Sequence, residues 1–275
     1  MNFRTDLAVE AAVNCRVSGE DVEQTCRKEG SLVLHTTRIL TPRGEAEVGK
    51  PRGRYITAVL PSLTDHEGDF AAYAAAIGGE LAGMLPPEGT VLVVGLGNRA
   101  VTPDALGPAT ADLVLATRHI GGEFARTAGL TDLRPTAVMA PGVLGQTGTE
   151  SSEIVRGICR EIHPGAVIVM DALAARSVER LGRTVQLCDT GIAPGSGVGN
   201  DRRPLNREVL GVPVIGMGVP TVTDVLLDGT TPMMVTPREV DIMISRAARL
   251  LAMSIHAALH PAYSPMELVE VARGM

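Results

Sequence analysis

Short apolar runs alternate with longer amphipathic segments along most of the chain. The apolar runs are rich in Val, Ile and Leu and contain few polar residues, which is typical of strands that are buried on both faces of a sheet. The runs that predict strands are residues 55–60, 90–94, 136–140, 166–170, 185–188 and 212–217. The patterns that predict helices are residues 69–85, 104–120, 151–162 and 237–259. This alternation predicts an α/β protein: a three-layer doubly wound domain with a largely parallel sheet.

Local signals set several of the predicted boundaries. Asp69 is placed to cap the first helix and the polar cluster 147–151 to cap the third, which residues 163–165 (His-Pro-Gly) are expected to end. In the last helix, apolar residues recur at three-and-four spacing over 240–255, which indicates a stripe that faces the core. The segments predicted to be surface loops, from their content of Gly, Pro and charge, are residues 16–30 and 41–54.

Composition narrows the class of protein. The 275 residues include 25 Lys+Arg and 31 Asp+Glu, a formal charge of −6, so direct nucleic-acid binding is not expected. Only 2% of residues are aromatic while 45% are hydrophobic, which predicts an aliphatic core without stacking platforms. The four cysteines form no CxxC pair, which favours a reducing, cytoplasmic environment. Apolar runs shorter than about 20 residues, and a first segment without a signal-peptide pattern, predict no membrane contact.

The most informative segment runs from the apolar residues 90–94 through Gly95 and Gly97 to Asp104. It places a carboxylate just beyond the carboxyl end of a buried strand, where sites form in doubly wound folds. Capping of the next helix is the alternative role for Asp104, and the pattern leaves both roles open. The two glycines lack the full GxGxxG spacing and no P-loop lysine follows, so they indicate a tight turn and not a nucleotide site.

A second apolar run, 166–170, ends directly in Asp171. If the two strands are parallel members of one sheet, Asp104 and Asp171 share its carboxyl edge. Capping or pairing with Arg176 is the alternative role for Asp171 alone. Two carboxyl groups in one crevice repel each other, so one can stay protonated while the other activates water.

The segment 188–202 contains too many glycines for a regular element. We interpret it as an irregular loop, with a plain linker as the alternative. Its main-chain amides at Gly195, Ser196 and Gly197 are candidates to approach a substrate or a developing oxyanion.

Other catalytic chemistries find little support. The six histidines form no HExxH pattern, and Ser177 lies outside any GxSxG motif. The sequence also lacks a CxxC pair and a P-loop. We therefore expect hydrolysis that needs no metal and no other cofactor.

Five segments together resemble the germination protease family, and the resemblance extends from residue 4 to residue 261. The segments are residues 4–10, 95–98, 101–108, 171–177 and 191–200. The resemblance implies an atypical aspartic endopeptidase that is similar in fold to the hydrogenase maturation proteases. By motif, the two catalytic aspartates of the family map onto Asp104 and Asp171. It also implies small acid-soluble spore proteins as substrates, a homotetramer, and a location in the forespore or spore core.

The resemblance also gives the N-terminus a role. Members of the family are made as zymogens that remove their own propeptide, and their substrates are cut after an acid in a Thr-Glu-apolar-Ala-Ser-Glu context. Residues 5–10, Thr-Asp-Leu-Ala-Val-Glu, are similar to that context. The implied cut lies between Asp6 and Leu7, which gives a propeptide of residues 1–6 and a single peptidase domain of residues 7–275.

Three alternatives remain open at this point. A hydrogenase-maturation-like, metal-sensing peptidase would need a third ligand, commonly His, near the two acids. The Val-Gly-Leu-Gly-Asn stretch 94–98 is also similar to the start of peptidyl-tRNA hydrolases. Low basic content and the lack of an early catalytic His after this strand disfavour that class. A non-enzymatic protein with an acidic cleft would be favoured if Asp104 and Asp171 lay far apart.

Overall fold

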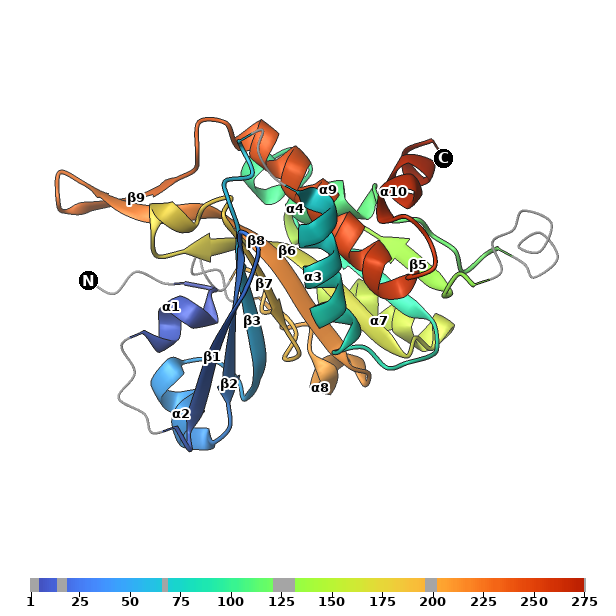
Figure 1. The fold of residues 1–275 in the computed structure, drawn as a ribbon, viewed down its shortest axis with the longest axis horizontal. Helices are drawn as coiled ribbons and strands as arrows, with labels where there is room; N and C mark the ends of the chain where they lie inside the picture. The colour runs from blue at the N-terminus through green and yellow to red at the C-terminus, as the bar shows by residue number, and fades with distance from the viewer. Residues whose placement is uncertain (1–4, 14–18, 66–68, 121–131, 196–201, 275) are drawn as a thin grey trace.

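In the computed structural model, a nine-stranded sheet lies at the centre of the molecule (Figure 1). The structure describes residues 5–13, 19–65, 69–120, 132–195 and 202–274. The strand order is β1-β2-β3-β7-β8-β6-β4-β5, and β9 pairs with β8 outside this path. The strands are β1 (Val22–Glu29), β2 (Leu32–Ile39), β3 (Gly53–Val59), β4 (Val91–Gly95), β5 (Thr136–Met139), β6 (Ala166–Ala175), β7 (Thr184–Cys188), β8 (Val214–Leu227) and β9 (Thr231–Val235).

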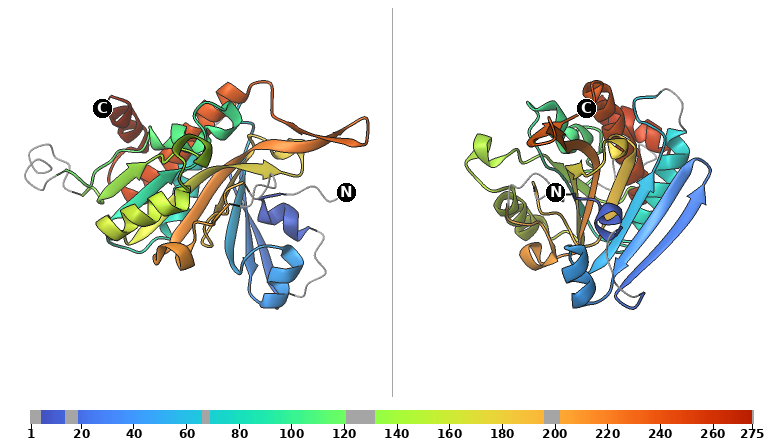
Figure 2. Two further views of the ribbon diagram at one scale, coloured as in Figure 1. Left: turned by 180° about the vertical axis from the view of Figure 1, so that it is seen from behind. Right: turned by 90° about the vertical axis from the view of Figure 1, so that its left-hand side faces the viewer.

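Helices cover both faces of the sheet. The helices of the described residues are α1 (Ala8–Ala12), α2 (Pro42–Val48), α3 (Phe70–Ala82), α4 (Leu106–Ala111), α6 (Leu144–Thr147), α7 (Ser151–Ile162), α8 (Arg207–Leu210), α9 (Val240–Leu259) and α10 (Pro265–Arg273). Two short 3-10 helices are η1 (Thr102–Asp104) and η2 (Val178–Arg180). Figure 2 shows α7 on the face of the sheet opposite α3 and α9. This arrangement confirms the α/β class.

Alternate residues of the central strands explain the three layers. Val91 and Val93 of β4 belong to the core cluster that contains α3 and α9, whereas Leu92 and Val94 pack with Val155 of α7. Successive side chains of a strand point to opposite faces, so an all-apolar strand is covered on both sides. The runs that predicted β4, β6 and β7 are therefore core strands.

The sheet is mixed, which differs from the prediction of a largely parallel one. β5, β4, β6 and β8 are parallel neighbours, while β1-β2, β2-β3, β3-β7, β7-β8 and β8-β9 pair antiparallel. The antiparallel part begins with β1, where only Val22 is buried. An exposed edge strand of this kind carries no apolar run, and for that reason the prediction of a loop over 16–30 was wrong for residues 22–29. Residues 16–18 lie outside the described residues.

Two other local predictions were wrong. Residues 41–54 contain α2, where Thr41 caps the helix by accepting from the Gly44 N–H at 3.1 Å and Gly49 ends it at φ +70°. Pro42 begins this helix and Gly49 is its C-cap, so these two residues do not mark a loop. The helix predicted over 104–120 is only α4 (Leu106–Ala111), and Asp104 does not cap it.

The remaining helices follow the sequence pattern closely. α7 spans Ser151–Ile162 as predicted and ends at His163, although Glu150 occupies its N-cap position without a side-chain cap. Asp69 caps α3 through the Ala72 N–H at 3.0 Å, as expected. α9 is long and apolar enough to cross a membrane by length and composition, but 67% of its apolar window is buried inside the protein. It occupies the place of a core helix.

Candidate active site

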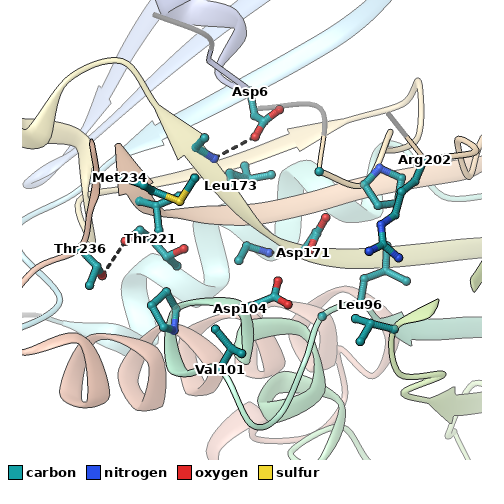
Figure 3. Close-up of a pocket in the computed structure, with 18 of the residues that line it drawn as sticks. Asp6, Leu96, Val101, Asp104, Asp171, Leu173, Arg202, Thr221, Met234 and Thr236 are labelled. Atoms are coloured by element: carbon teal, nitrogen blue, oxygen red, sulfur yellow. Dashed lines mark hydrogen bonds between the residues drawn. The ribbon is translucent and has the colours of Figure 1, made fainter. Parts of the chain in front are cut away.

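Two carboxyl groups from distant parts of the chain line one cavity of about 410 Å³ (Figure 3). Asp104 ends η1, which follows β4, and Asp171 lies in β6. β4 and β6 are parallel neighbours, with Gly95 opposite Met170. The structure therefore brings the two predicted acids to one edge of the sheet.

Close backbone packing holds Asp104 in place. Gly97 has φ +119°, and a Cβ built there would lie 1.9 Å from the Asp104 carbonyl oxygen. Only glycine tolerates both that conformation and that approach. The Asp104 carboxylate accepts a hydrogen bond from the Asn98 N–H at 2.8 Å. Gly97 thus helps to position a carboxylate. That carboxylate accepts its hydrogen bond from the Asn98 N–H in the turn, and not from an N–H of α4 as a helix cap would.

Asp171 lies inside its strand and not at the strand's end, because β6 continues for four residues to Ala175. Its side chain is 6% exposed, and Oδ1 accepts the N–H of Ala172 at 2.9 Å. The strand extends beyond the predicted 166–170 because residues 172–175 pair with β8 through a register shift after Leu173. Residues before and after Asp171 pair with β8, so the sheet fixes the main chain at this position.

Burial raises the pKa of both acids, and the negative charge of Asp104 adds to this effect at Asp171. The pKa of Asp171 lies well above its usual value, first because the side chain is buried and then because Asp104 and Asp6 add negative charge. Burial also raises the pKa of Asp104, against the opposing effects of the Asn98 N–H and Arg202. Asp171 therefore holds a proton more firmly, and Asp104 ionises first.

The rest of the cavity wall is mainly apolar and main-chain. Thr221 of β8 and Thr236 after β9 form one side, where the Thr236 hydroxyl donates to the Thr221 carbonyl at 2.8 Å. Gly195 lines the cavity with φ +73°. Ser196 and Gly197, the other two residues predicted for that loop, lie outside the described residues.

The two residues of the implied cleavage site lie close to this cavity. Asp6 lines it, and its carboxylate accepts the Ala174 N–H at 2.8 Å (Figure 3). Leu7 is fully buried, and the Asp6 carbonyl accepts a hydrogen bond from the Gln186 side chain at 2.7 Å. The Asp6-Leu7 bond is thus held by the fold while the Asp6 side chain reaches the acids' cavity.

Three residues that shape the site were not predicted from the sequence: Asn98, Arg202 and Gln186. Asn98 follows the Gly-Leu-Gly turn directly, and its side chain accepts from Gln146 at 2.8 Å. Arg202 lines the cavity and lowers the pKa of both acids. Its position after the glycine-rich loop is the one signal in the sequence that could have singled it out.

Residues for a metal site are not gathered in the described parts of the chain. There, no group of three or more His, Cys, Asp or Glu lies close enough together to hold a metal ion. His256 and His260 of the α9 region are fully buried beside Leu113 and Arg134, and neither belongs to the described wall of the cavity. A third ligand of the kind that a metal-sensing peptidase needs is therefore missing from that wall.

A family model described as "Germination protease" matches residues 6–229. The chain belongs to the germination protease family. The germination protease of Caldanaerobacter subterraneus subsp. tengcongensis is 37% identical over 98% of this chain and 97% of its own length. That of Clostridium perfringens is 36% identical over 94% and 96%, and that of Bacillus velezensis is 42% identical over 81% and 63%. As a germination protease, the chain is a peptidase of spore germination.

Among solved structures, a [NiFe] hydrogenase maturation protease, HycI from Thermococcus kodakarensis KOD1, is 19% identical to this chain. The match covers 64% of this chain and 98% of that one, with a TM-score of 0.39.

Proposed function

We propose that this germination protease is an aspartic endopeptidase that begins the degradation of small acid-soluble spore proteins, with Asp104 and Asp171 activating water. One observation carries the proposal: two carboxyl groups with raised pKa values, that of Asp171 buried and that of Asp104 half-buried, line the same cavity. Perturbed acids in a cleft are the groups that acid–base catalysis requires. Water activation by an acid pair needs no metal or other cofactor, so we propose that none takes part.

The pKa directions suggest which acid does what. Asp104, which ionises first, takes a proton from water as the water oxygen attacks the scissile carbonyl carbon. Asp171, which keeps its proton, donates it toward the leaving amine as the C–N bond breaks. The products are one carboxylic acid and one amine. Transfer of the proton from Asp104 to Asp171 then returns the pair to its starting state. Arg202 offsets part of the negative charge that accumulates on the two acids.

The test is cleavage of a purified small acid-soluble spore protein, with the cut sites mapped by mass spectrometry. We expect Asp104→Asn and Asp171→Asn each to lower the cleavage rate about 100-fold or more, because the amide keeps the shape of the acid without its proton chemistry. Asp112→Asn is the control, since Asp112 is an exposed acid that pairs with Arg99 outside the cavity. Near-wild-type cleavage by either of the first two variants would refute the acid pair.

We also propose that the chain is a zymogen, activated by its own cut between Asp6 and Leu7. The position of Asp6 on the wall of the cavity supports this. The resemblance to the family supports two further proposals: a homotetramer, and action in the cytoplasm of the forespore or the spore core.

A further inference from the structure

β6 has an open edge beside the two acids. β4 ends at Gly95, opposite Met170, whereas β6 runs on to Ala175. Beyond Met170, no strand in the described chain pairs with β6 on the side of β4, while β8 pairs with it on the other side. An unpaired edge presents main-chain N–H and C=O groups that can bind another extended chain.

Hydrogen bonds already present show which residue of this edge is available for pairing. The Met170 carbonyl accepts from the Leu96 N–H at 2.8 Å, so alternate residues from Met170 onward direct their main-chain groups toward this side. The N–H of Ala172 is taken by the Asp171 carboxylate at 2.9 Å. Ala174 is the next residue whose N–H and C=O both point toward the unpaired edge of β6.

Asp6 forms two hydrogen bonds with the main chain of Ala174, as a residue of a neighbouring strand would. The Asp6 N–H donates to the Ala174 carbonyl at 2.9 Å, and the Ala174 N–H donates to the Asp6 carboxylate at 2.8 Å. The side-chain oxygen stands in for the carbonyl that a neighbouring strand would supply. Ala172, Leu173 and Ala174 also line the cavity of the acids, so a chain on this edge leads into it (Figure 3).

We infer that the substrate polypeptide binds in extended form along this edge, with one of its residues paired to the N–H and C=O of Ala174, the place that Asp6 holds in the uncut chain. The inference rests on the proposed peptidase function and names the binding site that serves it. Main-chain pairing suits a peptidase, because every polypeptide segment offers the same donors and acceptors.

Strand geometry sets the register. Ala174 follows Asp171 by three residues, and a strand rises about 3.3 Å per residue, so the two lie about 10 Å apart along the edge. The substrate residue paired with Ala174 is therefore about three residues from the bond that is cut. The same spacing means that Asp6, paired with Ala174, does not present its own carbonyl to the acids, and that carbonyl is bound by Gln186 instead.

The experiment measures peptide binding without cleavage. The protein is the full chain with Asp104→Asn, and the probe is a 14-residue synthetic peptide with Thr-Glu-Leu-Ala-Ser-Glu at its centre. Each peptide N–H is replaced in turn by an ester oxygen, which removes one donor with little change of shape. We expect one ester about three residues from the Glu-Leu bond to weaken binding at least fivefold. A flat scan, or a loss confined to the Glu-Leu bond itself, would overturn the inference.

Variants of Asp6 test the competition in the same background. Asp6→Ala should lower the Kd of the peptide at least threefold, because the carboxylate no longer covers the Ala174 N–H. Asp6→Asn is the matched control: its amide oxygen still accepts from Ala174 but carries no charge, so its Kd should stay near that of the parent chain. Equal Kd values for Asp6→Ala and the parent would contradict occupation by Asp6, and equal gains in both variants would assign the effect to charge.

The outcomes separate this inference from the proposed function. Cleavage of spore protein by the wild-type chain that has been cut between Asp6 and Leu7, together with a flat ester scan, leaves the function standing and refutes the edge. A position-specific scan without cleavage of spore protein by that cut chain supports the edge and refutes the function.

Discussion

At the scale of single residues, Gly97 determines where the Asp104 carboxylate lies. Its φ of +119° and the 1.9 Å approach of the Asp104 carbonyl leave no room for a side chain. Any β-carbon there has to push the η1 turn away from β4. The position of the carboxylate thus depends on a residue that carries no functional group.

We predict that Gly97→Ala lowers kcat for peptide cleavage at least tenfold, because catalytic groups act only within a narrow range of positions. The free energy of unfolding should fall by about 1–3 kcal/mol, the usual cost of strain at such a backbone position. Gly79→Ala in α3 is the control, since a Cβ there meets nothing within 4 Å. Steady-state kinetics and urea denaturation of the two variants measure both effects, and equal kcat values for both would contradict the prediction.

Arg202 is a cation that acts on both acids of the cavity. It lowers the pKa of both Asp104 and Asp171, so its removal should raise both values. Activity that needs one acid ionised and one protonated gives a bell-shaped profile, whose limbs report the pair and not either residue. We predict that Arg202→Met moves both limbs of kcat/KM to higher pH, by about half a unit or more.

Arg203→Met is the matched control for this measurement. Arg203 is the neighbouring cation, is mostly exposed and lies 3.5 Å from Glu153 instead of an acid of the cavity. Its profile should coincide with that of the wild-type chain. A shift of the Arg202→Met limbs to lower pH would show that Arg202 does not act on the acids as a cation.

The acids could be predicted from sequence, whereas their supporting residues could not. Asp104 and Asp171 each follow an apolar run, and the edge where parallel strands end is a known place for sites. Arg202, Asn98 and Gln186 act through contacts between segments that are distant in sequence or across a turn, and no local pattern encodes those contacts.

At the scale of elements, the C-terminal end of α9 carries two buried histidines. His256 and His260 are both 0% exposed, and their ring centroids lie 5.8 Å apart. Burial lowers the pKa of each to about 4, and for His260 the neighbouring His256 and Arg134 contribute as well. Both rings are therefore neutral in the folded protein at neutral pH.

This arrangement predicts acid sensitivity. A histidine with a pKa of about 4 when folded and about 6.5 when unfolded binds more protons in the unfolded state between these values. Its contribution to stability is thus complete above about pH 6.5 and is lost as the pH falls toward 4. We expect each histidine to lower the free energy of unfolding by about 2 kcal/mol between pH 7 and pH 5.

Urea denaturation at pH 7 and pH 5 tests this prediction. The double variant His256→Gln, His260→Gln should show a smaller drop between the two pH values, whatever its stability at pH 7. The control is His163→Gln at the end of α7, for which we expect the same drop as in the wild-type chain. An unchanged drop in the double variant would assign the acid sensitivity to other groups.

Strands that are buried on both faces were predicted well, whereas β1, β2 and β9, which each expose part of a face, were not predicted. The runs of β4, β6 and β7 are apolar because both faces of these strands are covered. β9 is exposed along most of its length and β1 along all but one residue, so neither has a hydrophobic period to read. Contacts across the sheet, not local pattern, keep these strands extended.

At the scale of the whole molecule, residues 5–10 tie the N-terminus to two strands. Gln186 of β7 bonds both the Asp6 carbonyl and the Ala8 N–H, each at 2.7 Å. The Glu10 carboxylate accepts the main-chain N–H groups of Arg176 and Ser177, just after β6. Self-cleavage after Asp6 therefore has to act on a segment that the fold holds firmly.

We predict that protein held under activating conditions acquires a new N-terminus at Leu7, and that Asp6→Glu speeds its appearance because Glu matches the residue cut in the substrate context. Mass spectrometry over time measures the fraction cut. The Asp104→Asn variant should keep its original N-terminus. Processing of that variant at the wild-type rate, with no other peptidase present, would rule out self-cleavage by this pair of acids.

The proposed cut would create a positive charge on the buried residue Leu7. In the uncut chain Leu7 is 0% exposed and presents a neutral amide, whose N–H donates to the Thr5 hydroxyl at 3.0 Å. Hydrolysis turns that nitrogen into an α-amine with a pKa near 8, which is cationic at neutral pH. An unpaired ammonium at a fully buried position costs several kcal/mol. Moving the start of α1 until this charge reaches water or a carboxylate avoids that cost, so one broken bond would loosen the segment that the uncut chain holds in place.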